Sequence, residues 1–147
     1  MNVIGVIPAR LDASRFPGKP LAKILGMPMI GHCYHRTMLA LGGASTYVAT
    51  CDNEIADYIY SIGGQVVMTS NSHTRATTRT AEALEYIEKD AKEKVDIVVM
   101  VQGDEPLITP EAIGAIMPHF NDESVEIVNI MSRLLTYEQF VDRNNVK

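Results

Sequence analysis

The first loop of the chain concentrates residue types that bind phosphate. Between Ala9 and Pro20 it carries three cations, a hydroxyl and a glycine, namely Arg10, Ser14, Arg15, Gly18 and Lys19. The phosphates of a nucleoside triphosphate need such charge-assisted donors and a small residue where the backbone approaches. The loop matches neither the GxxxxGK[ST] nor the GxGxxG pattern, so neither a kinase nor a dehydrogenase is indicated. A solvated surface loop with incidental charges is the alternative.

A second motif, Val101-Gln102-Gly103-Asp104-Glu105-Pro106, follows the most apolar run of the chain. A carboxylate just after a buried strand lies where α/β sheets place their ligands, and its hard oxygens suit Mg²⁺ that bridges phosphates. Asp104 is therefore the predicted metal ligand, and Gly103 would let a ligand approach the backbone. The alternative for Asp104 is a turn residue before Pro106.

A third segment, from Asn71 to Arg79, leads into a predicted helix. Thr77 or Thr78 could cap that helix, and the unpaired N–H groups of its first turn could instead meet an anion or a base carbonyl. His73 has no second histidine or cysteine at ligand spacing, which favours a hydrogen-bonding role over metal binding.

Alternating strands and helices are expected to position these segments. The predicted strands cover 3–7, 46–50, 66–69, 97–101 and 125–131; the predicted helices cover 29–41, 53–62, 77–92 and 111–120, with a helical turn or two within 135–141. Asp52 or Asn53 is a plausible cap of the second helix. This alternation predicts a parallel sheet covered on both faces, with ligands at the carboxyl ends of the strands. One domain, residues 1–147, is expected.

Composition excludes several classes of function. A net charge of −5 and 6% aromatic residues disfavour a nucleic-acid-binding or anionic-lipid-binding surface. Cys33 and Cys51 lack the spacing of metal ligands and are predicted to be free thiols. No apolar run is long enough for a signal sequence or a membrane span, so we expect a cytoplasmic protein with no membrane partner.

Three pieces in this order, IPARLDASRFPGKPL, MTSNSHTRATTRTAEA and VQGDEPLI, resemble the 3-deoxy-manno-octulosonate (Kdo) cytidylyltransferase family, and the similarity runs through the intervening chain. The resemblance implies a Rossmann-like nucleotidyltransferase fold, with three α/β/α layers and a mostly parallel sheet. It also implies that CTP and Kdo give CMP-Kdo and pyrophosphate, with Mg²⁺, for lipopolysaccharide synthesis.

The same resemblance assigns roles by position. Arg10 and Lys19 would stabilise charge on the departing pyrophosphate, and Asp104 would bind Mg²⁺ and complete the catalytic set. The nucleotide-binding residues that it implies are Ala9, Arg10, Ser14, Arg15, Lys19, Thr77, Arg79 and Gln102.

Two departures from the family bear on function. Where the family has Ser-Gly-Thr-Glu-Arg, this chain has Arg75-Ala76-Thr77-Thr78-Arg79, which leaves the preference for CTP open. The family also continues beyond this C-terminus with more of the sheet, the acid-sugar pocket and dimer contacts, so the resemblance implies a truncated fold that forms a homodimer or otherwise self-associates. The acceptor could be another acid sugar or a phosphonate. A catalytically silent nucleotide-binding module that needs a partner chain is the other alternative.

Overall fold

The computed structural model describes residues 1–12 and 16–143. Its contacts divide the chain into two compact units, Met1–Gly114 and Ala115–Lys147. All four strands of the main sheet and the three longest helices belong to the first unit. The single domain over 1–147 therefore stays a prediction, and the two units are described separately.

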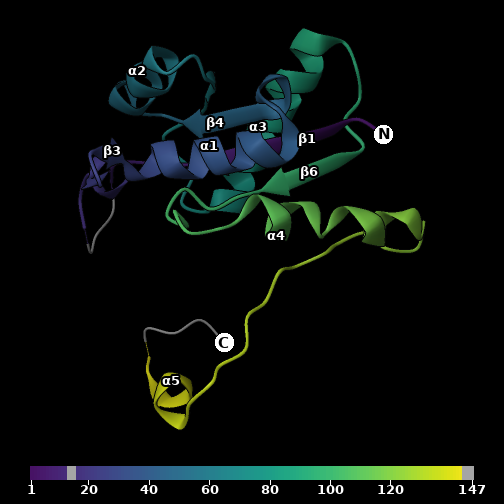
Figure 1. Ribbon diagram of the computed structural model, residues 1–147. Coiled ribbons are helices and arrows are strands. Elements are labelled where there is room, and N and C mark those ends of the chain that lie inside the picture. The colour runs from purple at the N-terminus through teal and green to yellow at the C-terminus, as the bar shows by residue number, and fades with distance from the viewer. Residues whose placement is uncertain (13–15, 144–147) are drawn as a thin grey trace. The chain divides into compact units, whose positions relative to one another are not determined.

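A four-stranded parallel sheet forms the middle of the first unit (Figure 1). Its strands are β1 (Val3–Pro8), β4 (Thr46–Thr50), β5 (Gln65–Met68) and β6 (Ile97–Met100), in the spatial order β5-β4-β1-β6. β1 pairs with β4 on one side and with β6 on the other. The predictions for these four strands are confirmed to within one residue at each end. Their β-branched residues suit a sheet that is buried on both faces.

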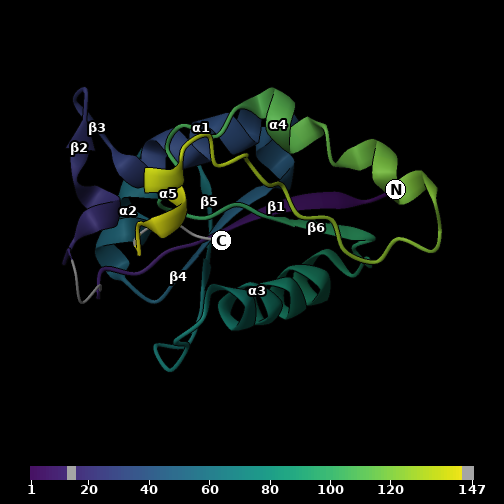
Figure 2. The ribbon, with the colours of Figure 1, turned by 90° about the horizontal axis from the view of Figure 1, so that it is seen from below.

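Helices cover both faces of this sheet. α1 (Met29–Leu41) and α3 (Ala76–Ala91) lie on opposite faces, as Figure 2 shows. α2 (Asn53–Ser61) packs beside α1, where a Cβ on Gly31 would lie only 2.2 Å from the Tyr58 hydroxyl oxygen. α1 ends at Gly42 and α2 ends shortly before Gly63, and both glycines have positive φ (89° and 74°). The predicted three-layer α/β/α arrangement is confirmed.

Two apolar layers hold the helices on the sheet. Under α3, the buried cluster consists of Ile4, Val6, Ala49, Ala83 and Ile87. Other side chains with at most 2% exposure include Ile7, Ile30, Cys33, Tyr34 and Val48. Burial of each large aliphatic side chain contributes about 1.5–3 kcal/mol. This packing fixes the strand ends from which the polar loops leave.

A small antiparallel ladder that the sequence analysis did not predict follows the first loop. A 3₁₀ turn, η1 (Lys19–Leu21), leads into β2 (Lys23–Ile24) and β3 (Met27–Pro28). The two residues between the strands, Leu25 and Gly26, have φ of 50° and 87°. Positive φ at both central residues is the requirement of a type I′ hairpin turn.

The predicted helix over 111–120 is wrong in its extent. α4 (Pro110–Gly114) ends in the first unit, and a separate 3₁₀ turn, η3 (Met117–Asn121), lies in the second. Pro118 explains the interruption, because it lacks an N–H and its ring clashes with the preceding turn of an α-helix.

The predicted strand over 125–131 is also wrong, since these residues have no regular structure. A strand needs a partner for its peptide groups, and the described part of the second unit contains no other strand. The predicted helical turns near the C-terminus are confirmed as α5 (Tyr137–Val141), which Thr136 and Gln139 cap reciprocally. Within the described residues, no helix is both long enough and apolar enough to cross a membrane.

Candidate functional site

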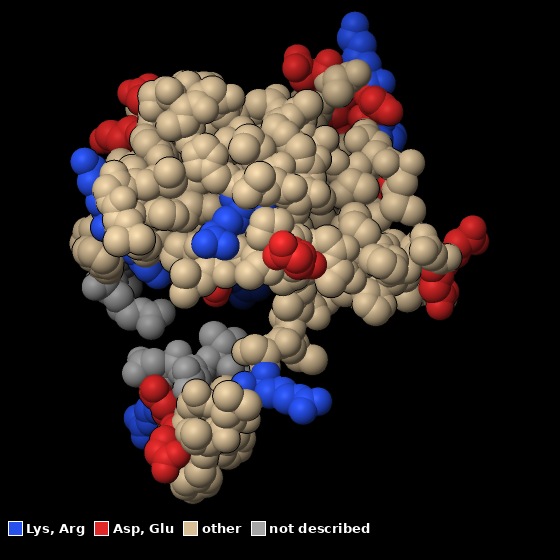
Figure 3. Space-filling model, viewed as in Figure 1, with Lys and Arg blue, Asp and Glu red and all other residues tan. Residues whose placement is uncertain are grey.

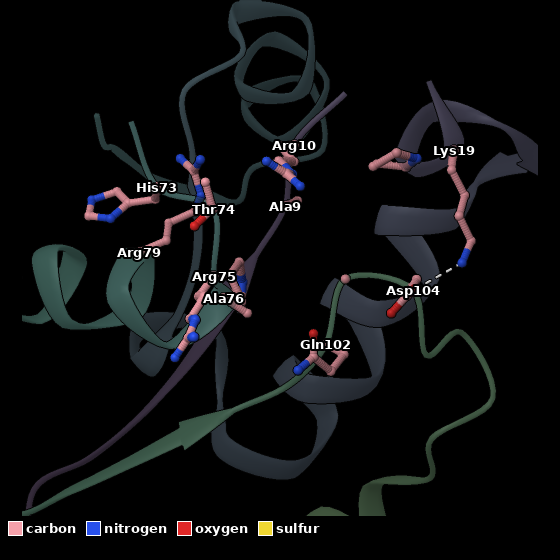
Figure 4. Close-up of a pocket in the computed structure, with 13 residues that line it drawn as sticks. Ala9, Arg10, Lys19, His73, Thr74, Arg75, Ala76, Arg79, Gln102 and Asp104 are labelled. Carbon is pink, nitrogen blue, oxygen red and sulfur yellow. Dashed lines mark hydrogen bonds and ion pairs between the residues drawn. The ribbon is translucent and has the colours of Figure 1, made fainter. Parts of the chain in front are cut away.

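A pocket of about 210 Å³ opens where β1 and β6 end and α3 begins. Figure 4 shows the residues that line it: Pro8, Ala9, Arg10, Lys19, Pro20, His73, Thr74, Arg75, Ala76, Arg79, Gln102, Gly103 and Asp104. Four of these residues are cations, and Asp104 is the one carboxylate among them. In a chain with a net charge of −5, this is a local concentration of positive charge suited to an anion.

The first loop is tied to the end of β4. The Ala9 N–H donates to the Ala49 carbonyl at 2.9 Å, and the Leu11 N–H donates to the Asp52 carboxylate at 2.7 Å. Ala9 and Arg10 leave the sheet between these two contacts and reach the pocket. The loop returns at Gly18, whose φ of 72° directs the chain into the turn that carries Lys19. Ser14 and Arg15, predicted to bind phosphate, lie outside the described residues.

Asp52 is the N-cap residue of α2, one of the two that were predicted, and its side chain has a second role. It occupies the N-cap position of α2, which begins at Asn53, but its side chain makes no capping hydrogen bond. The carboxylate instead accepts the Leu11 N–H, 41 residues earlier in the chain. The predicted N-cap position is therefore confirmed at Asp52, whereas its carboxylate binds a donor from another loop in place of the first turn of α2.

Gln102, Gly103 and Asp104 form a tight turn directly after β6. The Val101 N–H continues the pairing with β1 at the Val6 carbonyl (3.0 Å), and the Glu105 N–H donates to the Gln102 carbonyl (3.2 Å). A Cβ on Gly103 would lie 2.8 Å from the Pro8 carbonyl oxygen, so the turn can pack this closely only at a glycine. Asp104 Oδ2 accepts a hydrogen bond from Lys19 Nζ at 2.8 Å, the dashed line in Figure 4.

The third segment is held by a carboxylate of α3. Glu82 accepts a hydrogen bond from the Ser70 N–H at 2.9 Å and pairs with His73 Nε2, while His73 Nδ1 contacts the Thr78 hydroxyl at 3.0 Å. The Ser70 N–H, and then the His73 ring, lower the pKa of Glu82 from its usual 4.5. The predicted hydrogen-bonding role of His73 is therefore confirmed.

The start of α3 differs from the prediction. Arg75 is the N-cap residue and provides no side-chain cap, while the Thr78 hydroxyl donates to the Arg75 carbonyl. Neither Thr77 nor Thr78 is the N-cap, because α3 begins at Ala76 and both threonines lie inside its first turn. Thr77 is exposed and does not line the pocket. Its predicted contact with the nucleotide is not tested by this geometry.

Arg79 is a buried cation at the back of the pocket. Its side chain is only 3% exposed, and its guanidinium donates to the Thr69 hydroxyl at 2.5 Å and to Cys51 Sγ at 3.6 Å. Neither partner is a carboxylate, and within the described residues none lies within 4.0 Å of Arg79. A buried charge with only neutral partners favours an anionic or strongly polar ligand in the pocket.

The pocket unites most of the predicted site. Six predicted residues line it, namely Ala9, Arg10, Lys19, Arg79, Gln102 and Asp104. His73, Thr74, Arg75 and Ala76 were not predicted as site residues, although Arg75 and Ala76 stood out as departures from the family pattern. Among the described residues, no group of three or more His, Cys, Asp or Glu could hold a metal ion alone. Asp104 would therefore need ligand oxygens to complete a metal site.

A parallel three-layer α/β fold with a cationic pocket at its strand ends is the arrangement typical of nucleotide-binding proteins. A family model described as cytidylyltransferase matches residues 4–147, and the chain belongs to that family. A 3-deoxy-manno-octulosonate cytidylyltransferase of Trichlorobacter lovleyi is 41% identical over 148 residues, which is 100% of this chain and 56% of that protein. A mitochondrial one of Arabidopsis thaliana is 43% identical over 99% of this chain and 49% of its own length.

Solved structures agree with this assignment. A CMP:2-keto-3-deoxy-manno-octonic acid synthetase complexed with CTP superposes with a TM-score of 0.73 at 36% identity, over 85% of this chain and 50% of that one. A cytidylyltransferase of Leptospira borgpetersenii has the same fold, with a TM-score of 0.69 at 22% identity. The chain thus spans about half the length of the relatives that it matches.

Proposed function

We propose that this chain forms the nucleotide-binding part of a cytidylyltransferase that transfers CMP from CTP to the acid sugar Kdo, for lipopolysaccharide precursor synthesis. The observation that carries the proposal is the convergence of Arg10, Lys19 and Asp104 in one pocket. They come from two loops far apart in the sequence, and they are the residue types that a metal-bound triphosphate requires. The relatives named for this reaction, and the related structure complexed with CTP, support the choice of nucleotide and acceptor.

Each side chain has a defined part in this reaction. Arg10 and Lys19 bind the triphosphate and stabilise the charge that collects on the departing pyrophosphate. The sugar hydroxyl oxygen bonds to the α-phosphorus and loses its proton to solvent, while the bond between the α-phosphorus and the bridging oxygen breaks. Gln102 lies beside the nucleotide or the sugar, and positioning supplies much of the rate enhancement.

The donor set fits Mg²⁺ held jointly by protein and substrate. Asp104 offers one half-exposed carboxylate (53%) in the pocket, and Mg²⁺ is commonly bound by one or two carboxylates, phosphate oxygens and water. When bound, Mg²⁺ would polarise the α-phosphate. Lys19 leaves Asp104 for the phosphates when both ligands enter.

Calorimetric titration with CTP, UTP and ATP, each with and without Mg²⁺, tests the nucleotide assignment. We expect selective binding of CTP that Mg²⁺ tightens, and we expect Asp104→Asn to remove the effect of Mg²⁺ while keeping metal-free binding. A folded chain that binds none of the three nucleotides would contradict the proposal and favour a silent module. Product formation with Kdo, another acid sugar or a phosphonate, tested with any partner chain that completes the fold, then identifies the acceptor.

A further inference from the structure

Arg36 is the one Lys, Arg, Asp or Glu residue of α1, whose sequence is MIGHCYHRTMLAL. Figure 3 shows that the side of the first unit on which α1 lies is largely uncharged. Arg36 is half-buried, and its guanidinium donates to the Ile108 carbonyl at 3.2 Å. Among the described residues, no carboxylate lies within 4.0 Å of it. The charged Arg36 side chain therefore donates its hydrogen bond to a backbone carbonyl of the segment that follows β6.

From Ile108, two hydrogen-bonded turns lead back to Asp104. The Ile108 N–H donates to the Glu105 carbonyl at 3.2 Å, and the Glu105 N–H donates to the Gln102 carbonyl at 3.2 Å. Asp104 lies inside the second of these turns. The two turns share Glu105, so a donor that holds the Ile108 carbonyl also limits the movement of the run back to Gln102.

α1 also contacts the near end of the same segment. Ile30 Cδ1 would lie 3.3 Å from a Cβ on Gly103, which places its methyl group against that glycine. Cys33 is fully buried, and burial raises the pKa of its thiol to about 11, while the nearby Glu105 peptide group opposes this rise. Ile30, Cys33 and Arg36 are spaced by three residues, so each is a neighbour of the next on the helix surface. One line of α1 residues thus follows the segment from Gly103 to Ile108.

We propose that Arg36 is a positioning residue for Asp104. Its guanidinium fixes the far end of the segment 102–108, and the two turns transmit this restraint to the carboxylate that faces Lys19. Without it, the segment between β6 and α4 loses this hydrogen bond to α1, and Asp104 samples positions from which it cannot meet a metal bound to phosphate. The role of Asp104 in this argument rests on the proposed function, whereas the restraint on the segment does not.

Amide hydrogen exchange on the 147-residue chain tests the restraint directly. Arg36→Met keeps the length and packing of the stem but removes the donors, and Arg36→Lys keeps a charged donor. We expect exchange at Glu105 and Ile108 to be about tenfold faster or more in Arg36→Met and close to wild type in Arg36→Lys. The amides of Val6 and Val48 in the sheet report global stability and should not change. Unaltered exchange at Glu105 and Ile108 would overturn the proposal.

Binding of Mn²⁺ in the presence of CTP, followed by electron paramagnetic resonance, tests the consequence for Asp104. We expect Arg36→Met to weaken Mn²⁺ binding by about tenfold, which corresponds to about 1.4 kcal/mol, and Arg36→Lys to recover most of it. Metal-free CTP binding should change less than Mn²⁺ binding does. Arg133→Met is the matched control, because it removes the same charge from an exposed position in the second unit.

The two measurements separate the two proposals. If the wild-type chain binds Mn²⁺ and CTP, and Arg36→Met binds both equally tightly, the positioning of Asp104 by Arg36 is wrong. If the wild-type chain binds neither, the proposed function is wrong, and the exchange rates alone decide whether Arg36 restrains the segment.

Discussion

Lys19 Nζ and Asp104 Oδ2 lie 2.8 Å apart, although 85 residues separate them in the sequence. This ion pair joins the cationic first loop to the turn after β6. Both side chains are partly exposed, at 34% and 53%, and pairs of this kind contribute about 1 kcal/mol or less. An incoming ligand can therefore separate the two groups at little energetic cost.

Lys19→Met should separate metal binding from triphosphate binding. In the absence of nucleotide, a divalent ion competes with Lys19 for Asp104, so we expect the variant to bind Mn²⁺ about two- to fivefold more tightly, as loss of up to about 1 kcal/mol predicts. Binding of CTP should weaken, because a phosphate loses its cation. Paramagnetic resonance and calorimetry measure the two effects. Lys23→Met, at an exposed position of β2, is the matched control. If Lys19→Met weakens the binding of Mn²⁺ as well as that of CTP, Lys19 does not compete with the metal for Asp104.

Gly103→Ala should destabilise the first unit. The new methyl group would lie 2.8 Å from the Pro8 carbonyl, so either β1 or the turn must shift, at about 1–3 kcal/mol. Gly114→Ala is the control, since nothing lies within 4 Å of its Cβ and Gly114 ends a helix. Urea unfolding of both variants measures the difference. Equal urea midpoints for the two variants would show that the turn after β6 accommodates the new methyl group without loss of stability.

Asp52→Asn should loosen the first loop without unfolding the sheet. The Leu11 N–H then donates to a neutral amide in place of a carboxylate, a loss of about 1 kcal/mol, or about fivefold in an equilibrium constant. We expect faster exchange at Leu11 and weaker CTP binding. Asp57→Asn is the control, because it makes the same chemical change at an exposed position of α2. Equal exchange rates at Leu11 and equal CTP affinities in the two variants would show that the Asp52 carboxylate does not hold the first loop.

The two thiols should differ in reactivity. Cys33 has no exposed surface, and burial raises its pKa to about 11, so it remains protonated near pH 8, whereas Cys51 is partly exposed. We expect a thiol reagent to modify one residue in the folded chain and both in denaturant. Cys51→Ser should remove the fast reaction, and Cys33→Ser should keep it. Rapid modification of Cys33 would contradict the packing of α1.

Glu82 should make the stability of the chain depend on acid pH. Its folded-state pKa is lowered by the Ser70 N–H and by His73, so its contribution is complete above the usual value of 4.5 and is lost as pH falls through the lowered value. Glu82→Gln should be destabilised near neutral pH and approach wild type in acid. Urea unfolding from about pH 7 to about pH 3 measures this convergence. Glu85→Gln, exposed on the same helix, should follow wild type throughout.

The sequence predicted the sheet well because its signals are local. The apolar runs of β1 and β6 are bounded by turn residues, and Gly42 and Gly63 end α1 and α2 with positive φ. Such features do not depend on contacts between distant segments. The prediction over 125–131 failed for the opposite reason, because β-branched composition cannot supply a pairing partner.

The motifs that could carry chemistry were likewise visible in the sequence, but the hydrogen bonds that hold them in place were not. Arg10, Lys19 and Asp104 stood out by residue type and position. The acceptor role of Asp52 and the donor role of Arg36 depend on contacts 41 and 72 residues away, which no local pattern encodes. Arg79 was predicted from family resemblance, and its burial beside Thr69 and Cys51 became visible only in the folded chain.

The central place of β1 in the sheet has a consequence for how the chain folds. Val3 pairs with Ile97, so β1 stays incomplete on one side until β6, far later in the sequence, has been synthesised. Pairing across such a separation is slow, because the conformational entropy of the long loop is lost before any contact stabilises the pairing. β1, β4 and β5 leave the ribosome first, and the cationic loop emerges with them. Among the residues that line the pocket, Asp104 is the last to be synthesised, so the carboxylate joins the pocket after its four cations.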